Sequence, residues 1–153
     1  MRIPKGSRNN STQMNFKIWT DGGSRGNPGP CGAGGVIKDS GEVVIAEVSE
    51  YLGVQTNNYA EYKALEITLN RAVQLQIKNV IVYLDSKLVV EQMKGKWKVK
   101  NENIIPLHKE ICGIISYFDS IEFIHIPRRF NKEADALANK AMDSVNTKFI
   151  EPA

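Results

Sequence analysis

The fold of this chain is decided by the stretch Phe16-Lys17-Ile18-Trp19-Thr20-Asp21 and by the glycine-rich segment that follows it. Apolar and polar residues alternate through the stretch, which predicts a β-strand in which Asp21 shares a face with Trp19. Seven glycines and two prolines then fall between positions 22 and 35. This composition predicts a loop with tight turns that runs into a second strand near Ala33–Lys38.

Hydrophobic patterns predict the remaining elements. An N-cap signal at Thr56-Asn57-Asn58 starts a helix that runs to about Leu75. The other patterns predict three more strands, at Glu42–Ser49, Val80–Leu84 and Ile121–Ile126, and helices at Lys87–Met93, from Asn101 to Phe118, and at Asn131–Met142.

The predicted order of elements is β-β-β-α-β-α-α-β-α. The first three strands most simply form an antiparallel meander. A helical crossover then favours a fourth strand that lies parallel to the first. The chain is therefore predicted to be an α/β protein with a five-stranded mixed sheet, antiparallel meander plus parallel strands, flanked by helices.

Length and composition fit one globular domain. The chain has 153 residues, and we place the domain at residues 16–145, after a disordered basic leader at residues 1–15 and before a C-terminal tail at residues 146–153. Arg2, Lys5 and Arg8 account for the whole net charge of +3. Overall charge therefore gives no argument for a nucleic-acid partner, which has to be argued from where the charges lie.

The chain shows no sign of a membrane or of export. No apolar run approaches the roughly 18 residues of a membrane span, and no signal-peptide pattern precedes the domain. We therefore expect a cytoplasmic protein that does not contact a membrane. Cys31 and Cys112 are predicted to be two reduced thiols rather than a disulfide, and no cluster of Cys and His predicts zinc.

Four acids lie on positions that face the interior of predicted elements. Asp21 and Asp85 end apolar strands, while Glu61 and Asp135 begin two helices on the same stripe as the apolar residues. Buried unpaired charge is costly, and a pair of divalent cations would remove that cost. For any one acid alone, a surface charge or a helix cap is the simpler interpretation.

Four motifs of this chain together resemble type 1 ribonuclease H, and in particular the short members that lack a basic protrusion. The motifs occur in the family's order at Thr20–Pro30, Thr56–Glu61, Leu84–Ser86 and Asn131–Ala138, and the match spans roughly Phe16–Met142. The resemblance implies a ribonuclease H-like fold. It also implies endonucleolytic hydrolysis of the RNA strand of an RNA/DNA hybrid, which leaves 3′-hydroxyl and 5′-phosphate ends.

The resemblance also implies two Mg²⁺ ions as cofactors, with Mn²⁺ as a substitute. Two such ions would balance the four negative charges of the acids and suit their oxygen ligands. We expect Asp21 to bridge both ions, Asp85 and Glu61 to complete the better-organised site, and Asp135 to hold the second ion. Two-metal sites of this kind hold the attacking and leaving oxygens of an in-line displacement.

Several residues near these motifs are candidate contacts to the hybrid. The glycine-rich segment lacks the pattern of a P-loop or a dinucleotide site, so it is either a simple turn or, by resemblance, a close approach to the RNA minor groove. Contacts to 2′-hydroxyls, bases or phosphates are expected from Gly22, Gly23, Asn27, Thr56, Asn57 and Asn58. Plain helix capping is an equal alternative for Thr56 and Asn58.

The segment Lys94–Lys100 holds four lysines, no acid and Trp97. We expect Lys96, Trp97 and Lys98 to contact phosphates and sugars of the DNA strand, although a solvated charged face is the alternative.

One feature of the family is missing. Many relatives carry a histidine on the loop before the last acid, whereas residues 127–131 here contain Arg128 and Arg129 instead. We hypothesise that Arg129, or Arg128, replaces the histidine electrostatically, and simple phosphate binding is the alternative. His125 is interpreted as structural and His108 as an exposed helix residue.

We therefore expect the chain to be a ribonuclease H that acts as a monomer and needs no obligatory protein partner. Two alternatives stay open. The first is a catalytically silent hybrid-binding module, and the second is another nuclease on the same fold that acts on DNA.

Overall fold

The structure is a computed structural model. It describes the backbone of residues 15–150 and the side chains of residues 15–145. Nearly all of the predicted leader, residues 1–14, and the last three residues of the predicted tail lie outside the described residues. None of the helices among the described residues has both the length and the apolar character needed to span a bilayer.

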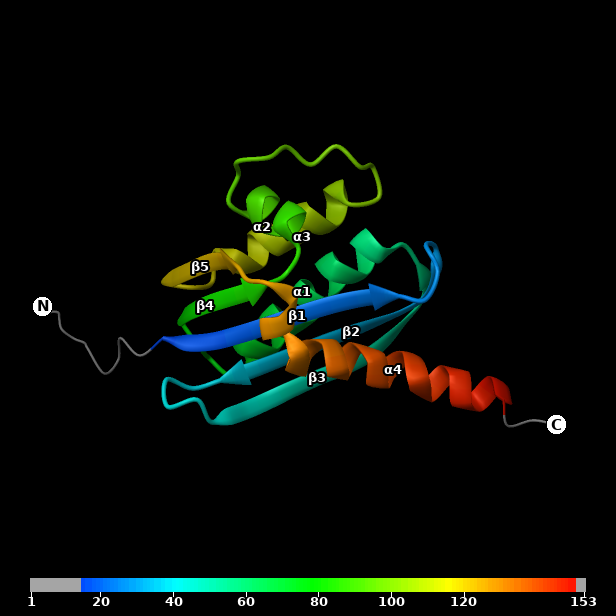
Figure 1. Cartoon of the computed structure of the whole chain (residues 1–153). Coiled ribbons are helices and arrows are strands. Elements are labelled where there is room, and N and C mark those ends of the chain that lie inside the picture. The colour runs from blue at the N-terminus through cyan, green and yellow to red at the C-terminus, as the bar shows by residue number, and fades with distance from the viewer. Residues whose placement is uncertain (1–14, 151–153) are drawn as a thin grey trace, which may run out of the picture.

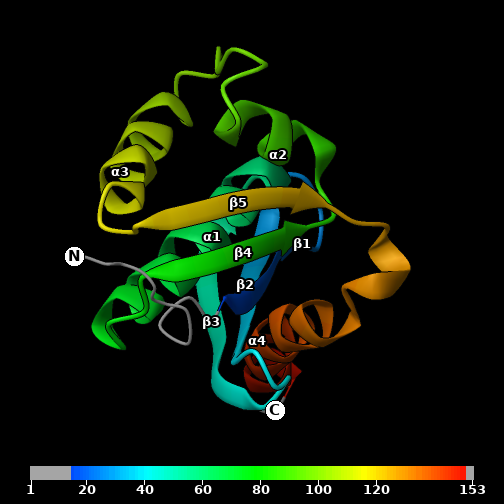
Figure 2. The same cartoon turned by 90° about the vertical axis from the view of Figure 1, so that its left-hand side faces the viewer.

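A single mixed sheet forms the centre of the molecule (Figures 1 and 2). The strands lie in the order β3-β2-β1-β4-β5. The β1–β2 and β2–β3 pairs are antiparallel, whereas the β1–β4 and β4–β5 pairs are parallel. This is the predicted meander with two parallel strands added. The strands are β1 (Phe16–Ser24), β2 (Gly29–Lys38), β3 (Val44–Gln55), β4 (Asn79–Leu84) and β5 (Ser120–His125).

Helices cover both faces of the sheet. On one face, α1 packs against β1 and β2 and also contacts α3, while α4 packs against β2, β1 and β3 from the opposite face (Figure 1). The helices are α1 (Asn57–Gln74), α2 (Lys87–Met93), α3 (Ile105–Ile115) and α4 (Lys132–Ile150), with a 3-10 turn η3 at Arg128–Phe130.

The hydrophobic core lies between α1 and the sheet. Ile18 of β1, Leu65 and Leu69 of α1, and Val82 of β4 are fully buried in one cluster. Burial of each such side chain contributes about 1.5–3 kcal/mol. The core therefore fixes the start of α1 against the carboxyl ends of β1 and β4, where the predicted acids lie.

The glycine-rich segment is mostly strand, so the prediction of a loop there was wrong. β1 continues to Ser24 and β2 already begins at Gly29. A Cβ atom on Gly22 would lie 2.1 Å from the carbonyl oxygen of Ala60 in α1, and one on Gly34 would lie 2.0 Å from that of Ala134 in α4. Glycine is needed here because both helices approach the strand backbones closely.

Other element boundaries also differ from the predictions. β3 extends to Gln55 because a register shift opposite Cys31 and a positive φ at Gly53 let the strand continue past its predicted end. α3 begins only at Ile105, since Pro106 has no amide hydrogen and fits only the first turn of a helix. α4 continues through Ile150, well beyond the predicted end at Met142 and into the predicted tail. α1 and α2 lie where the sequence placed them.

Both cysteines are free thiols, as predicted, with Cys31 buried and Cys112 exposed.

Candidate active site

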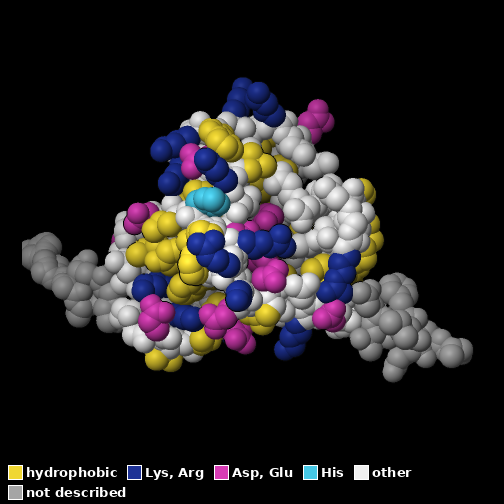
Figure 3. All heavy atoms as spheres, in the orientation of Figure 1, with side chains coloured by type: hydrophobic (Ala, Val, Ile, Leu, Met, Phe, Trp, Pro, Cys, Tyr) yellow, Lys and Arg dark blue, Asp and Glu magenta, His cyan; other side chains and the backbone are white. Residues whose placement is uncertain are grey.

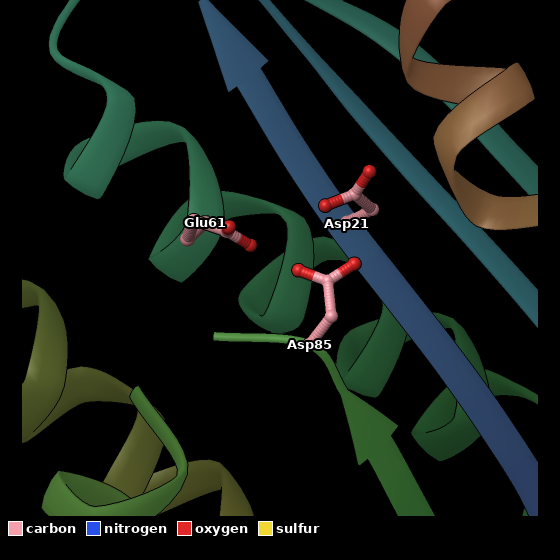
Figure 4. A group of neighbouring side chains, drawn as sticks. All are labelled: Asp21, Glu61 and Asp85. Atoms are coloured by element: carbon pink, nitrogen blue, oxygen red, sulfur yellow. The ribbon is translucent and has the colours of Figure 1, made fainter. Parts of the chain in front are cut away.

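Three of the four predicted acids meet at the carboxyl ends of β1 and β4 (Figure 4). Asp21 lies in β1 and Asp85 directly follows β4, and the parallel pairing of Trp19 with Tyr83 brings these two strand ends side by side. Glu61 reaches them from the first half of α1. One carboxylate oxygen from each acid lies within 4.8 Å of the others, so the predicted convergence of these three is confirmed.

The start of α1 is fixed in a way that aims Glu61 at Asp21. The side chain of Thr56 caps the helix by accepting a hydrogen bond of 3.2 Å from the amide of Tyr59. Oε1 of Glu61 then accepts a hydrogen bond of 3.2 Å from the amide of Gly22, the residue directly after Asp21. Because Gly22 has no Cβ, α1 can lie close enough to the strand for this bond to form.

Asp135 faces the same place from α4. It lines a hollow of about 260 Å³ together with Asp21, Glu61 and Asp85. The neighbouring carboxyl group of Asp135 is one of the causes that raise the pKa of Asp21. The helix that carries Asp135 begins at Lys132, so this half-buried acid projects from its first turn. All four predicted acids therefore border one hollow.

The electrostatics of the hollow favour a bound cation. Burial raises the pKa of Asp21 to about 9, and repulsion by Glu61 and Asp85 adds to the rise. Burial also raises the pKa of Glu61 to about 8, against the lowering effects of the Gly22 amide and Arg128. Without a counter-charge, such acids hold protons near neutral pH. The all-oxygen donor set fits a hard divalent cation such as Mg²⁺, which relieves the same repulsion.

Asn131 is a site residue that sequence reasoning missed. Its side chain is 1% exposed, and its Nδ2 donates to Oδ2 of Asp85 at 3.0 Å and to the carbonyl oxygen of Thr20 at 2.9 Å. The carbonyl oxygen of Asn131 accepts the amide hydrogen of Asp135 at 3.1 Å. One buried amide therefore connects β1, the end of β4 and the start of α4. In the sequence Asn131 opens the fourth motif, four residues before Asp135, but nothing there indicated its partners.

The two arginines of η3 have different surroundings. Arg128 lines the hollow of the acids, and its charge lowers the pKa of Glu61. The guanidinium of Arg129 instead lies 4.7 Å from the ring centroid of exposed Phe130, and Arg129 is absent from the lining of the hollow. Of the two alternatives, the geometry favours Arg128 as the residue that acts on the carboxylates.

The predicted contacts of the glycine-rich segment lie beside the acids. Gly22, Gly23 and the side chain of Asn57 line the hollow. Oδ1 of Asn27 accepts a hydrogen bond of 3.0 Å from the amide of Asn57, which holds the β1–β2 turn against the start of α1. The Thr56 hydroxyl oxygen accepts the capping hydrogen bond, so this residue is a helix cap. A hydroxyl that accepts can also donate, and the substrate contact of Thr56 stays a prediction.

A second hollow, of about 620 Å³, lies next to the start of α1. Asn58 lines it together with three predicted contacts of the lysine-rich segment, Lys96, Trp97 and Lys98. Residues 94–100 form turns and irregular chain rather than an extended strand, and Trp97 is 45% exposed. In Figure 3, Lys and Arg side chains gather over the loop between α2 and α3 and beside the acids at the centre of the same face. Basic side chains also border both hollows, because Arg25 and Arg128 line the first and Lys96, Lys98 and Lys100 line the second.

The two histidines lie elsewhere. His125 ends β5 and is exposed, while His108 is half-buried in α3, contrary to the expectation that it is exposed. Neither lines the hollow of the acids.

A five-stranded mixed sheet with acids at the ends of its two central strands defines the class of this protein as an α/β protein with a ribonuclease H-like fold. A family model described as reverse transcriptase-like matches residues 19–141. The chain therefore belongs to this reverse transcriptase-like family. It is also 30% identical to the ribonuclease H of Chromobacterium violaceum, a match that covers 88% of this chain and 99% of that protein, so it belongs to the ribonuclease H family that its motifs predicted.

Relatives in sequence and structure agree with this assignment. The chain is 46% identical over 132 residues to the bifunctional protein Rv2228c of Mycobacterium tuberculosis, a match that covers 86% of this chain and 36% of that protein. The chain thus spans about a third of the length of the first curated relatives that it matches.

Solved structures give the same result. The N-terminal ribonuclease H domain of Rv2228c is similar with a TM-score of 0.85 and 43% identity, covering 88% of this chain and 98% of that one. LC11-RNase H1, solved in complex with an RNA/DNA hybrid, is similar with a TM-score of 0.81 and 40% identity, covering 86% of this chain and 99% of that one.

Proposed function

We propose that this protein hydrolyses the RNA strand of RNA/DNA hybrids endonucleolytically and leaves 3′-hydroxyl and 5′-phosphate ends. The observation that carries the proposal is the convergence of Asp21, Glu61 and Asp85 within 4.8 Å in a hollow that Asp135 also lines. The similarity to a ribonuclease H1 solved with a hybrid supports the choice of substrate.

The acids would hold two Mg²⁺ ions, with Mn²⁺ as a substitute. Asp21 borders every other acid and would contribute to both ion sites, Glu61 and Asp85 would complete one of them, and Asp135 would serve the other. Bound divalent cations would supply the charge that activates a water nucleophile and stabilises the departing 3′-oxygen.

The protein's own groups would position the substrate and the acids. Asn131 fixes the rotamer of Asp85 through its hydrogen bond of 3.0 Å. Arg128 places a positive charge at the rim of the hollow, where a scissile phosphate would lie. Gly22 and Gly23 would present backbone to the RNA where they line the hollow, and Asn57, held by Asn27, would offer an amide to a 2′-hydroxyl or base edge.

The lysine-rich segment would bind the DNA strand. Lys96 and Lys98 provide charge for phosphates, and exposed Trp97 provides a face for a sugar, next to Asn58. Contacts of this kind position the substrate but read no bases, so we expect weak sequence preference and a steep fall of affinity with salt.

The direct test is cleavage of labelled substrates. RNA/DNA hybrid, RNA duplex and DNA duplex are incubated with the protein in Mg²⁺, in Mn²⁺ or in excess EDTA. We expect cleavage of the RNA strand of the hybrid with either metal, no cleavage in EDTA, and no cleavage of DNA duplex. Undiminished hydrolysis in EDTA would contradict the metal site.

The same assay separates the two alternatives. Binding of hybrid without cleavage in either metal would identify a silent hybrid-binding module. Cleavage of DNA duplex in preference to hybrid would identify another nuclease on the same fold. The intact set of four acids argues against the first, and the glycines and asparagines beside Asp21 argue against the second.

We further propose that the protein acts as a monomer in the cytoplasm without an obligatory protein partner. Sedimentation of the purified chain during turnover tests the monomer, because activity only in a larger species would contradict it.

A further inference from the structure

The lysine-rich segment encloses another hollow on its side toward α3, away from the acids. This hollow has a volume of about 410 Å³ and shares no lining residue with the hollow of the acids. Its walls are largely apolar and include Trp97, Val99 and Ile105. Gln92, Trp97 and Lys98 line both this hollow and the one next to Asn58, so the two hollows adjoin.

This hollow contains a thiol beside an imidazole. Sγ of Cys112 lies 3.8 Å from Nδ1 of His108, one turn earlier on α3. Cys112 is exposed and therefore accessible to a reagent. Cys31, in contrast, is buried, and its thiol points at the carbonyl oxygens of Gly29 and Gln55, each at 3.3 Å. The chain thus holds one accessible thiol and one protected thiol.

The lining of the hollow indicates the kind of reagent that fits. Lys98 and Lys109 border it, and no acid is among its lining residues. Positive charge attracts anions, and apolar walls accept a small organic group. The thiolate, in turn, reacts with the sulfur of a disulfide.

We propose that Cys112 is a site of reversible modification by anionic low-molecular-weight disulfides. Oxidised glutathione is the disulfide of this class that the experiments below use. In this exchange the Cys112 thiolate attacks one sulfur of the disulfide and forms a new S–S bond. The original S–S bond breaks, and its other half leaves as a thiolate. The thiol proton passes to His108 and then to solvent, and the incoming disulfide is the oxidant.

Hydrogen bonds connect this site to the lysine-rich segment. A ring nitrogen of His108 lies 3.3 Å from the carbonyl oxygen of Gln92. The buried Gln92 side chain donates to the carbonyl oxygen of Lys98 at 3.2 Å and accepts a hydrogen bond from Tyr62, the neighbour of Glu61. Because Trp97 and Lys98 line the same hollow as Cys112, an adduct on Cys112 would displace them and add negative charge beside the lysines.

The functional consequence rests on the proposed function. If the lysine-rich segment binds the DNA strand, an anionic adduct beside it lowers affinity for hybrid and leaves the chemistry of the acids unchanged. KM for hybrid should therefore rise, and kcat should stay the same.

The modification itself is tested without any nucleic acid. The full chain is treated with oxidised glutathione or with the cationic disulfide cystamine, and the adducts are followed by intact mass and peptide mapping. We expect a single adduct on Cys112, formed at least about fivefold faster from oxidised glutathione than from cystamine. Equal rates for the two disulfides, or equal modification of Cys31, would overturn the site.

Two variants separate the contributions of charge and imidazole. In the double variant Lys98→Gln/Lys109→Gln, oxidised glutathione and cystamine should modify Cys112 at similar rates. In His108→Gln, both disulfides should react more slowly. An unchanged rate in His108→Gln would remove the imidazole from the proposal.

The coupling to substrate is tested with the adduct and with Cys112→Ser. We expect the adduct to weaken hybrid binding about tenfold at low salt, with recovery on reduction by dithiothreitol. Cys112→Ser treated with oxidised glutathione should bind and cut as the untreated protein does. Unchanged binding by the adduct would overturn the coupling. If the unmodified chain neither binds nor cuts hybrid, the proposed function fails, while the adduct on Cys112 is measured independently.

Discussion

The hollow of the acids and the lysine-rich segment are built in opposite ways. The acids come from β1, α1, the end of β4 and α4, and packing and buried hydrogen bonds fix them. The lysine-rich segment is one continuous stretch, residues 94–100, irregular and mostly exposed. Catalysis needs fixed geometry, whereas contact with a backbone of phosphates needs charge at the right place. Mutations in the two regions should therefore affect different kinetic constants.

The largest expected effect is that of Asp85→Asn. Loss of one carboxylate from the cluster should lower kcat at least about a thousandfold, because the cation site loses a ligand and its charge. Affinity for hybrid, measured by fluorescence anisotropy, should stay within about threefold or increase. Glu47→Gln, at an exposed acid of β3, is the matched control and should leave kcat unchanged. A variant at position 85 that still cuts would refute the cation model.

The next effect is that of Asn131→Ala. The variant keeps all four acids but removes the hydrogen bonds that orient Asp85 and anchor Thr20. We expect kcat to fall about 10–100-fold and the Mg²⁺ concentration for half-maximal activity to rise, as for other groups that orient metal ligands. Asn70→Ala, at an exposed asparagine of α1 that does not line the hollow of the acids, is the control. If kcat falls without any change in Mg²⁺ dependence, Asn131 has only a structural role.

The two arginines of η3 provide a smaller and sharper comparison. Arg128→Ala should lower kcat about tenfold, because Arg128 borders the acids and would interact with a phosphate there. Arg129→Ala should change kcat less than about twofold, since Arg129 packs on Phe130. Single-turnover cleavage separates this effect from product release. The reverse order of the two variants would show that Arg129 moves into the site when hybrid binds.

In the lysine-rich segment, the double variant Lys96→Ala/Lys98→Ala should act on KM. We expect KM to rise about five- to tenfold at low salt and the dependence of binding on salt to become shallower, because two phosphate contacts are lost. Lys140→Ala, at an exposed lysine of α4, is the matched control. A loss confined to kcat would mean that this segment acts on the acids rather than on the substrate.

The smallest effect concerns stability in the absence of metal. The pKa of Asp21 rises from 3.8 to about 9 and that of Glu61 from 4.5 to about 8 on folding. The folded state then binds more protons at these two acids than the unfolded state does between these values. Their contribution to stability is therefore greatest below about pH 4 and falls as the pH rises to about 9.

Asp21→Asn should therefore raise Tm of the metal-free protein at pH 8 by about 3 °C, and Mg²⁺ should stabilise the unmutated protein more than this variant. Scanning calorimetry of both proteins at pH 5 and at pH 8, first in EDTA and then with added Mg²⁺ in place of EDTA, measures both effects. A Tm of the unmutated protein that increases from pH 5 to pH 8 would contradict the burial of these charges.

Much of the fold could be read from local sequence. α1 begins where Thr56 predicted, because a hydroxyl that caps the helix and the apolar stripe that follows are local signals. The apolar run of β4 and the alternation of apolar and polar residues in β1 were likewise sufficient to predict these two strands. The glycine-rich segment was misread because its glycines serve close approach to α1 and α4, which no local pattern reveals.

The four acids of the site could be predicted from the sequence, but the residues that orient them could not. Each acid ended or began an element, so the topology implied that they meet. Asn131 was missed because its partners, Thr20 and Asp85, are 111 and 46 residues away. The choice between Arg128 and Arg129 likewise depends on the rotation of a short 3-10 turn, for which neighbouring residues in the sequence are equivalent.

The amino-acid order alone determined the type of fold, the four acids and the basic stretch, because these depend on periodicity, element ends and composition. Only the tertiary structure decided which neighbour supports each acid, which arginine faces them, and that an accessible thiol lies behind the lysine-rich segment beside an imidazole. Those outcomes depend on distances between side chains far apart along the chain, and packing, rather than local propensity, sets such distances.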